Sequence, residues 1–202
     1  MNENLTKSPR GRPKTLDRGH VLEMAMYSYW KEGIDGTSVN KICKLCNISK
    51  PSLYREFESE DGLVEAVLLF YVQNVQSKLL QKFDDELSFK DKLDSLVSYI
   101  TVEEKSLNSP KGCLIVKMLE SRSYLGESST KQLDLTRKKK LKIYEGWVER
   151  AKANKEITGA MSSNFVSKYI DFQVNNSLSQ IARGQQISTV KDILKLALSV
   201  LE

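Results

Sequence analysis

The segment that most constrains this chain is Thr37–Phe57, TSVNKICKLCNISKPSLYREF, whose apolar spacing predicts two short helices joined by a tight turn. In the first helix the apolar residues recur at i, i+3, i+4 and i+7 and form one inward-facing stripe: Val39, Ile42, Cys43 and Cys46. Thr37 precedes this run, so its side-chain oxygen is the expected N-cap acceptor.

The second helix carries a fuller start signal. Ser49 is the predicted N-cap, and Ile48 before it can pack on Leu53 as a hydrophobic staple. Pro51 falls in the first helical turn, where its missing N–H group costs no hydrogen bond. The helix therefore has a defined start within a few residues of the preceding helix.

The second helix also has two distinct faces. Leu53 and Phe57 are four residues apart and face the core. The side chains that point away from the core or flank it are polar or small: Lys50, Pro51, Ser52, Tyr54 and Arg55. A short helix with this division suits a DNA major groove. The segment therefore predicts a DNA-binding helix-turn-helix.

Residues 10–63 resemble the DNA-binding domain of the TetR (tetracycline-repressor) family. The resemblance rests on four motifs in order: WKEGIDGTSV (Trp30–Val39), CNISK (Cys46–Lys50), SLYREF (Ser52–Phe57) and SEDGL (Ser59–Leu63). It covers about a quarter of the chain. Family members commonly carry lysine directly after the serine of the last motif, where it contacts a DNA phosphate. This chain has Glu60 there, so that contact is not expected.

A basic arm precedes the helices. Residues 1–15 read as a flexible segment containing RGRPK, an extended basic sequence suited to an A·T-rich minor groove. An unbound, solubilising tail is the alternative. Together with the helix-turn-helix, the arm completes the predicted DNA-contacting set: Arg10, Arg12, Lys14, Thr37, Ser38, Lys41, Ser49, Lys50, Pro51, Ser52, Tyr54 and Arg55.

The distribution of charge supports this interpretation. The chain has a formal net charge of +5, from 31 basic and 26 acidic residues. Residues 1–55 hold 10 of the basic and 5 of the acidic residues, and the remaining 147 hold 21 of each. The whole excess therefore lies in residues 1–55, which hold all of the predicted DNA-contacting residues, as the neutralisation of phosphates requires.

The rest of the chain is predicted to be helical as well, giving an all-α protein of three parts. These are a basic arm (1–15), a three-helix DNA-binding domain (16–62) and a helical body (63–202). Body helices are expected from residue 59 onward and near 88–100, 113–124, 130–154, 162–183 and 189–201. The last two helices are so apolar that we expect another protein surface to cover them. The resemblance implies that this pair forms a four-helix interface in a homodimer.

The resemblance also implies a pocket for a small-molecule effector in the body. The residues that could line it are Tyr99, Cys113, Met118, Tyr144, Trp147, Phe172 and Gln173. Each of them, taken alone, equally fits a packed core. Helical spacing does not decide between these interpretations.

The sequence gives little support for metal binding or catalysis. Cys43-Lys44-Leu45-Cys46 is a C-x-x-C motif, but zinc would need two more ligands, and the chain offers only His20 and Cys113. Both cysteines of the motif also belong to the apolar stripe. Motifs of catalysis and phosphate binding are absent from the sequence, so neither an enzyme nor a metal or other cofactor is expected.

These observations predict a cytoplasmic transcriptional regulator. The N-terminus lacks an apolar signal sequence, and no apolar run is long enough for a membrane helix. The resemblance implies a homodimer that binds a pseudo-palindromic double-stranded operator, and a repressor released by a small effector, although activation stays open. The alternatives are a thiol-based redox sensor acting through Cys43 and Cys46, and an all-α enzyme of unknown chemistry.

Overall fold

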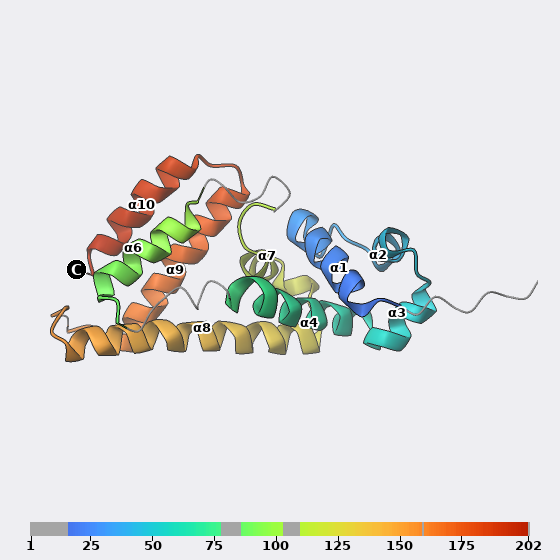
Figure 1. Ribbon diagram of the computed structural model, residues 1–202, viewed down its shortest axis with the longest axis horizontal. Coiled ribbons are helices and arrows are strands. Elements are labelled where there is room, and N and C mark those ends of the chain that lie inside the picture. The colour runs from blue at the N-terminus through green and yellow to red at the C-terminus, as the bar shows by residue number, and fades with distance from the viewer. Residues whose placement is uncertain (1–15, 78–85, 103–109, 159, 202) are drawn as a thin grey trace, which may run out of the picture.

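The computed structural model describes residues 16–77, 86–102, 110–158 and 160–201 (Figure 1). All of the regular elements in these ranges are helices, which confirms the all-α prediction. The α-helices are α1 (Arg18–Glu32), α2 (Val39–Cys46), α3 (Lys50–Phe57), α4 (Glu60–Tyr71), α6 (Phe89–Ile100), α7 (Leu114–Glu120), α8 (Glu127–Ala153), α9 (Ser163–Ala182) and α10 (Ile187–Ser199). Two short elements complete the order: a π-helix, η1 (Val72–Gln76), and a 3₁₀ helix, η2 (Arg122–Tyr124).

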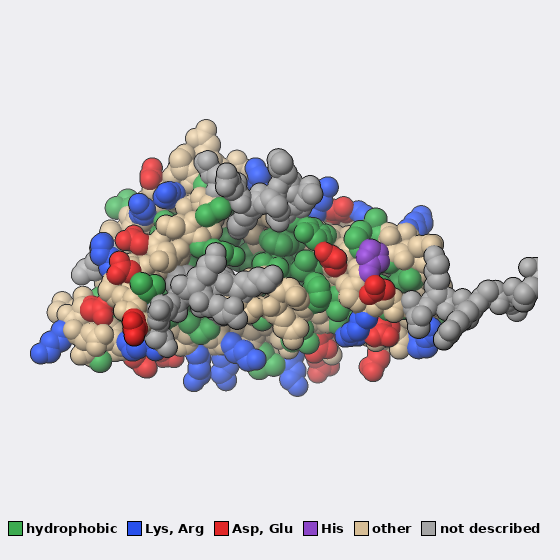
Figure 2. Space-filling view, in the orientation of Figure 1, with side chains coloured by type: hydrophobic (Ala, Val, Ile, Leu, Met, Phe, Trp, Pro, Cys, Tyr) green, Lys and Arg blue, Asp and Glu red, His purple; other side chains and the backbone are tan. Residues whose placement is uncertain are grey.

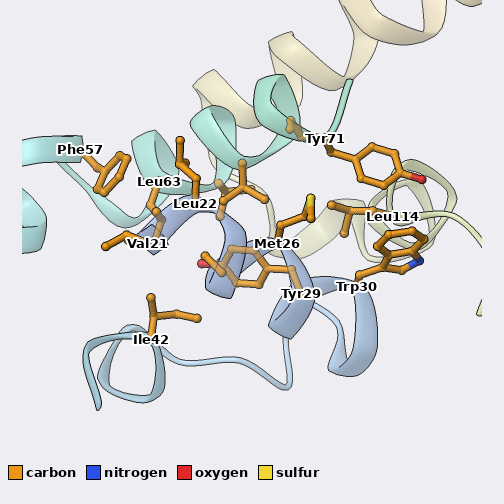
Figure 3. Packing of buried hydrophobic residues seen from close by; sticks show 14 of the residues in the cluster. Val21, Leu22, Met26, Tyr29, Trp30, Ile42, Phe57, Leu63, Tyr71 and Leu114 are labelled. Carbon is orange, nitrogen blue, oxygen red and sulfur yellow. The ribbon is translucent and has the colours of Figure 1, made fainter. Parts of the chain in front are cut away.

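Helices α1, α2 and α3 form an N-terminal head that packs on α4 (Figures 1 and 3). Its core includes Leu22 and Met26 from α1, Ile42 from α2, Leu53 from α3 and Leu63 from α4. Burying such aliphatic side chains contributes about 1.5–3 kcal/mol each and is what holds these short helices together.

The helix starts show which capping predictions were right. Asp17 caps α1, because its Oδ1 accepts a hydrogen bond from the His20 N–H at 3.1 Å. Ser49 caps α3 as predicted, and Ser59 caps α4. The N-cap of α2 is Ser38 and not Thr37, so that prediction was wrong: Ser38 Oγ accepts from the Lys41 N–H at 3.3 Å.

The remaining helices build a second core in the body. Helices α6, α8, α9 and α10 bury apolar residues against one another, including Leu96, Trp147, Ile170 and Leu194. Helix α8 is the longest described helix and packs against both α4, on which the head rests, and α9 of the body (Figure 1). Among the described residues, no helix is long and apolar enough to cross a membrane.

Two predicted body helices differ from the observed ones. The helix expected near 113–124 ends at Glu120 and is followed by the 3₁₀ helix. Helix α8 begins at Glu127, three residues before the expected start. Figure 2 shows both basic and acidic side chains along the edge formed by α8.

Candidate nucleic-acid interface

The turn between α2 and α3 is built on a left-handed residue. Asn47 has φ 52° and ψ 47°, and asparagine tolerates this conformation better than most residues with a side chain. Its N–H donates to the Lys44 carbonyl at 3.2 Å, and the Ile48 N–H donates to the Cys43 carbonyl at 3.0 Å. These two bonds close the end of α2 and bring the chain directly into α3.

Helix α3 has the two faces that its sequence predicts. Ser49 Oγ accepts from the Ser52 N–H at 3.3 Å and donates to Ser52 Oγ at 3.0 Å, which fixes the first turn. Leu53 is fully buried and Phe57 nearly so. Residues on the opposite face remain open to solvent: Lys50, Pro51, Tyr54 and Arg55 are exposed, and Ser52 is half-buried.

The two cations of α3 are available for a ligand. Within the described residues, neither Lys50 nor Arg55 forms an ion pair. Lys41 on α2 differs, because its Nζ contacts Glu32 Oε2, and this contact lowers the pKa of the Glu32 carboxyl. Of the three described lysine and arginine residues predicted to contact DNA, the two without an ion pair, Lys50 and Arg55, therefore lie on the helix predicted to enter the groove.

Thr37 does not belong to the exposed face. Its side chain is 1% exposed, and its hydroxyl donates to the Ser28 carbonyl at 3.3 Å. This bond ties the loop after α1 to the last turns of α1. The predicted DNA contact of Thr37 is therefore removed from the set, whereas its neighbour Ser38 is exposed.

The arm residues Arg10, Arg12 and Lys14 lie outside the described residues. Arg18, the first described cation after them, is held by the head. Its Nη1 lies 2.9 Å from Glu56 Oε1, and its guanidinium stacks 5.0 Å from the centre of the Phe57 ring. Arg18 therefore ties the start of α1 to the end of α3, a role that the sequence analysis missed because the contact spans 38 residues.

The C-x-x-C cysteines pack against the core. Cys43 is buried, Cys46 is half-buried, and both are free thiols. Burial raises the pKa of each thiol, which disfavours the reactive thiolate. Within the described residues, no group of three or more His, Cys, Asp or Glu side chains could hold a metal ion.

The seven residues predicted to line a ligand cavity are split among several environments. Met118 is 1% exposed and packs in the core of the head. Tyr144 and Trp147 are buried in the core of the body, and Phe172 is 70% exposed on α9. Tyr99 and Tyr144 both lie close enough to Cys113 to interact with it electrostatically, and a lining shared by all seven residues stays a prediction. Tyr99, Cys113 and Gln173 are half-buried.

A tyrosine-rich cluster surrounds Cys113. The Tyr71 hydroxyl donates to Cys113 Sγ at 3.4 Å, and Trp30 packs edge-on against the Tyr71 ring with 5.1 Å between ring centres. Burial, and then the proximity of Cys113, raise the pKa of Tyr71 and Tyr99. Tyr71 was absent from the predicted set because its helical spacing is that of an ordinary core residue.

An open groove lies elsewhere, between α7, α8 and α9, with a volume of about 760 Å³. Phe172 is the member of the predicted set that lines it. The charged side chains on its walls are paired: Arg122 with Asp134, Arg137 with the buried Asp171, and Arg183 with Glu120. Small-molecule sites commonly have volumes in this range.

Comparison with known proteins agrees with this geometry. The family model described as "Bacterial regulatory proteins, tetR family" matches residues 21–67, which contain α2, the turn and all of α3. Residues 21–67 therefore match the tetR family. The crystal structure of a TetR-family regulator from Agrobacterium tumefaciens superposes with a TM-score of 0.78 at 15% identity, over 91% of this chain and 96% of that chain.

Two curated proteins that this chain resembles are described as regulators. HTH-type transcriptional repressor ComR from Escherichia coli (strain K12) is 33% identical over 111 residues, which are 54% of this chain and 53% of ComR. An uncharacterized regulator, YvkB from Bacillus subtilis (strain 168), is 32% identical over 73 residues, 36% of this chain and 38% of YvkB. The chain thus spans about half or less of the length of these curated relatives.

One solved relative was determined with DNA. It is a cysteine mutant of the TetR family regulator CifR with 26-bp double-strand operator DNA, with a TM-score of 0.80 at 21% identity. The superposition covers 95% of this chain and 100% of that chain. At this identity the likeness shows the fold, which extends over head and body together.

Proposed function

We propose that this protein is a TetR-family repressor that binds a pseudo-palindromic double-stranded DNA operator as a homodimer. The observation that carries the proposal is the outward face of α3, where Lys50 and Arg55 are exposed and free of ion pairs in the described chain. Leu53 and Phe57 anchor this helix in the core, and its exposed polar face is the arrangement expected of a recognition helix. ComR is named a repressor, which supports that direction of regulation.

A homodimer is supported by the outer face of α9 and α10. Large apolar side chains are exposed there at helical spacing: Phe165 and Phe172 on α9, and Ile193, Leu196 and Val200 on α10. Leu196 is 73% exposed. Large apolar side chains exposed to this extent indicate an association surface. A second copy of the chain would cover it and place a recognition helix on either side of a twofold axis.

We further propose that residues 16–62 act as the DNA-binding domain and residues 63–202 as the effector-binding and dimerising body, in the cytoplasm and without catalysis. The groove between α7, α8 and α9 has a volume suited to a small effector. The effector would release the operator by binding more tightly to the conformation that does not bind DNA. A shift of the two heads would then separate the recognition helices from their grooves.

The operator footprint is the first test. The protein is expected to be a dimer in solution and to protect two half-sites about one helical turn apart, or a multiple of that distance. Binding is also expected to weaken steeply with salt, with the logarithm of affinity falling linearly against the logarithm of salt concentration. Footprinting, sedimentation and a salt titration of affinity measure these properties. A monomer that binds one half-site at full affinity, or a flat salt response, contradicts the proposal.

The cysteines of the head provide a second prediction. The double variant Cys43→Ala with Cys46→Ala is expected to bind operator normally, because both thiols serve packing. Its free energy of unfolding should fall by about 1 kcal/mol for each small buried change. Denaturant unfolding and operator affinity with and without reductant measure both properties. Oxidant-sensitive binding that disappears in the double variant would favour the redox alternative.

A further inference from the structure

The first turn of α8 is capped by a residue of another helix. Its N-cap is Gly126, which has no side chain to offer. The Asp61 carboxylate of α4 caps the helix instead, because it accepts from the Ser128 N–H at 2.8 Å, the Ser129 N–H at 3.1 Å and the Ser129 hydroxyl. The first N–H groups of a helix have no hydrogen-bond acceptor within that helix. Asp61 therefore supplies the acceptor for two of these N–H groups in α8.

Gly126 is what allows this contact. A Cβ atom at position 126 would lie 2.3 Å from Asp61 Cγ and 2.6 Å from each carboxylate oxygen. A larger residue would therefore push the carboxylate away from the helix end. Although partial burial raises the pKa of Asp61, the hydrogen bonds from Ser129, Ser128 and Gly126 lower it overall, so Asp61 is ionised at neutral pH.

A second contact of the opposite charge lies at the end of α1. Lys117, on α7 of the body, donates from Nζ to the Trp30 carbonyl at 3.0 Å and to the Lys31 carbonyl at 2.8 Å. These carbonyls belong to the last turn of α1, where a cation is favourable to the helix dipole. The first turn of α4, which directly follows the head, thus caps a helix of the body, and the body caps a helix of the head.

We propose that Asp61 and Lys117 form a two-point latch that sets the orientation of the head on the body. Asp61 lies in the first turn of α4, two residues after the N-cap that follows α3. The joint between α3 and α4 is itself tight, because Phe57 O approaches the Cα of Gly62 too closely to admit a Cβ. A displacement of α8 that breaks the Asp61 contact is therefore transmitted to the recognition helix.

The regulatory consequence rests on the proposed function. Neither Asp61 nor Lys117 belongs to the predicted DNA-contacting face, so both act as positioning residues. An effector that moves α7 or α8 breaks charge-assisted bonds at the ends of two helices and leaves their backbone groups to water. The latch thereby links the state of the body to the placement of α3 without a contact between effector and head.

Distances within one chain test the latch in the full-length protein. Spin labels are attached through noncanonical amino acids at Lys44 on α2 and Glu149 on α8, both exposed, and labelled protein is diluted with unlabelled protein. The variants are Asp61→Asn and Lys117→Met. The matched control is Asp134→Asn, which breaks a bidentate ion pair with Arg122 wholly within the body. Amide exchange at Ser128 and Ser129 reports the cap directly.

Both latch variants are expected to shift or broaden the Lys44–Glu149 distance distribution, and the control to leave it unchanged. Asp61→Asn should also speed amide exchange at Ser128 and Ser129 about tenfold or more, since bonds to a charged acceptor are lost. Ser129→Ala, which removes one donor, replaces Asp61→Asn if that variant does not fold.

An unchanged distribution in either variant, or an equal change in the control, overturns the latch. Operator binding separates this outcome from a failure of the proposed function. If the distances respond as expected while the wild type binds no DNA site, the latch stands and the repressor proposal fails.

Discussion

Replacing Gly62 with alanine is expected to lower the free energy of unfolding by about 3 kcal/mol, the upper end of what forced overpacking usually costs. The Cβ atom would lie 2.1 Å from the Phe57 carbonyl oxygen, well inside any real contact. Relief is difficult because the opposing atom is backbone, and Phe57 is anchored in the core. Denaturant unfolding followed by tryptophan fluorescence measures the loss, since Trp30 reports on the head.

Gly146 provides the matched control for this prediction. It lies within α8, and a Cβ atom there would meet nothing within 4 Å. Gly146→Ala is therefore expected to raise the free energy of unfolding by about 1 kcal/mol, the intrinsic helical preference for alanine. The opposite signs of the two changes are the critical result. A Gly62→Ala protein as stable as the wild type would show that α3 and α4 are not held in close contact.

Replacing Arg55 with alanine is expected to cost about 1–3 kcal/mol of operator-binding free energy and to relax base preference at one position per half-site. Arg55 is exposed on the face of α3 opposite Leu53 and Phe57, and its planar guanidinium matches the O6 and N7 edge of guanine. Folding and dimerisation should not change, because Arg55 packs in neither core. Operator selection from a random library measures the effect.

Lys50 provides the comparison for Arg55. Lys50→Ala should weaken binding to all DNA sequences more evenly and make the salt slope shallower, as the loss of a phosphate contact does. An unchanged consensus and affinity for Arg55→Ala would place base reading elsewhere, and the arm containing Arg10, Arg12 and Lys14 is then the first alternative.

The head could be predicted from the sequence because its signals are local. The Ser49 cap, Pro51 in the first turn and the spacing of Leu53 and Phe57 all lie within nine residues. Each acts on its own helix, and the structure confirms each of them. The start and the buried face of a short helix with a strong N-cap are therefore determined mainly by the residues of that helix.

Contacts between distant residues could not be predicted in this way. Two adjacent hydroxyl residues, Thr37 and Ser38, could each cap α2, and only the packing of Thr37 against the Ser28 carbonyl decides between them. The early start of α8 depends on Asp61, more than sixty residues away. Helical spacing likewise marks Met118 and Phe172 as apolar positions but does not say what covers them: Met118 is buried and Phe172 is exposed.

The ion pair between Lys41 and Glu32 has a consequence for discrimination between DNA sites. In the proposed complex, Lys41 would exchange its ion pair with Glu32 for a contact with a phosphate. The released carboxylate would then be close to the DNA backbone, which would repel it. Lys41 would consequently add little to weak, sequence-independent attraction, and an operator would need enough base contacts through α3 to compensate for this exchange.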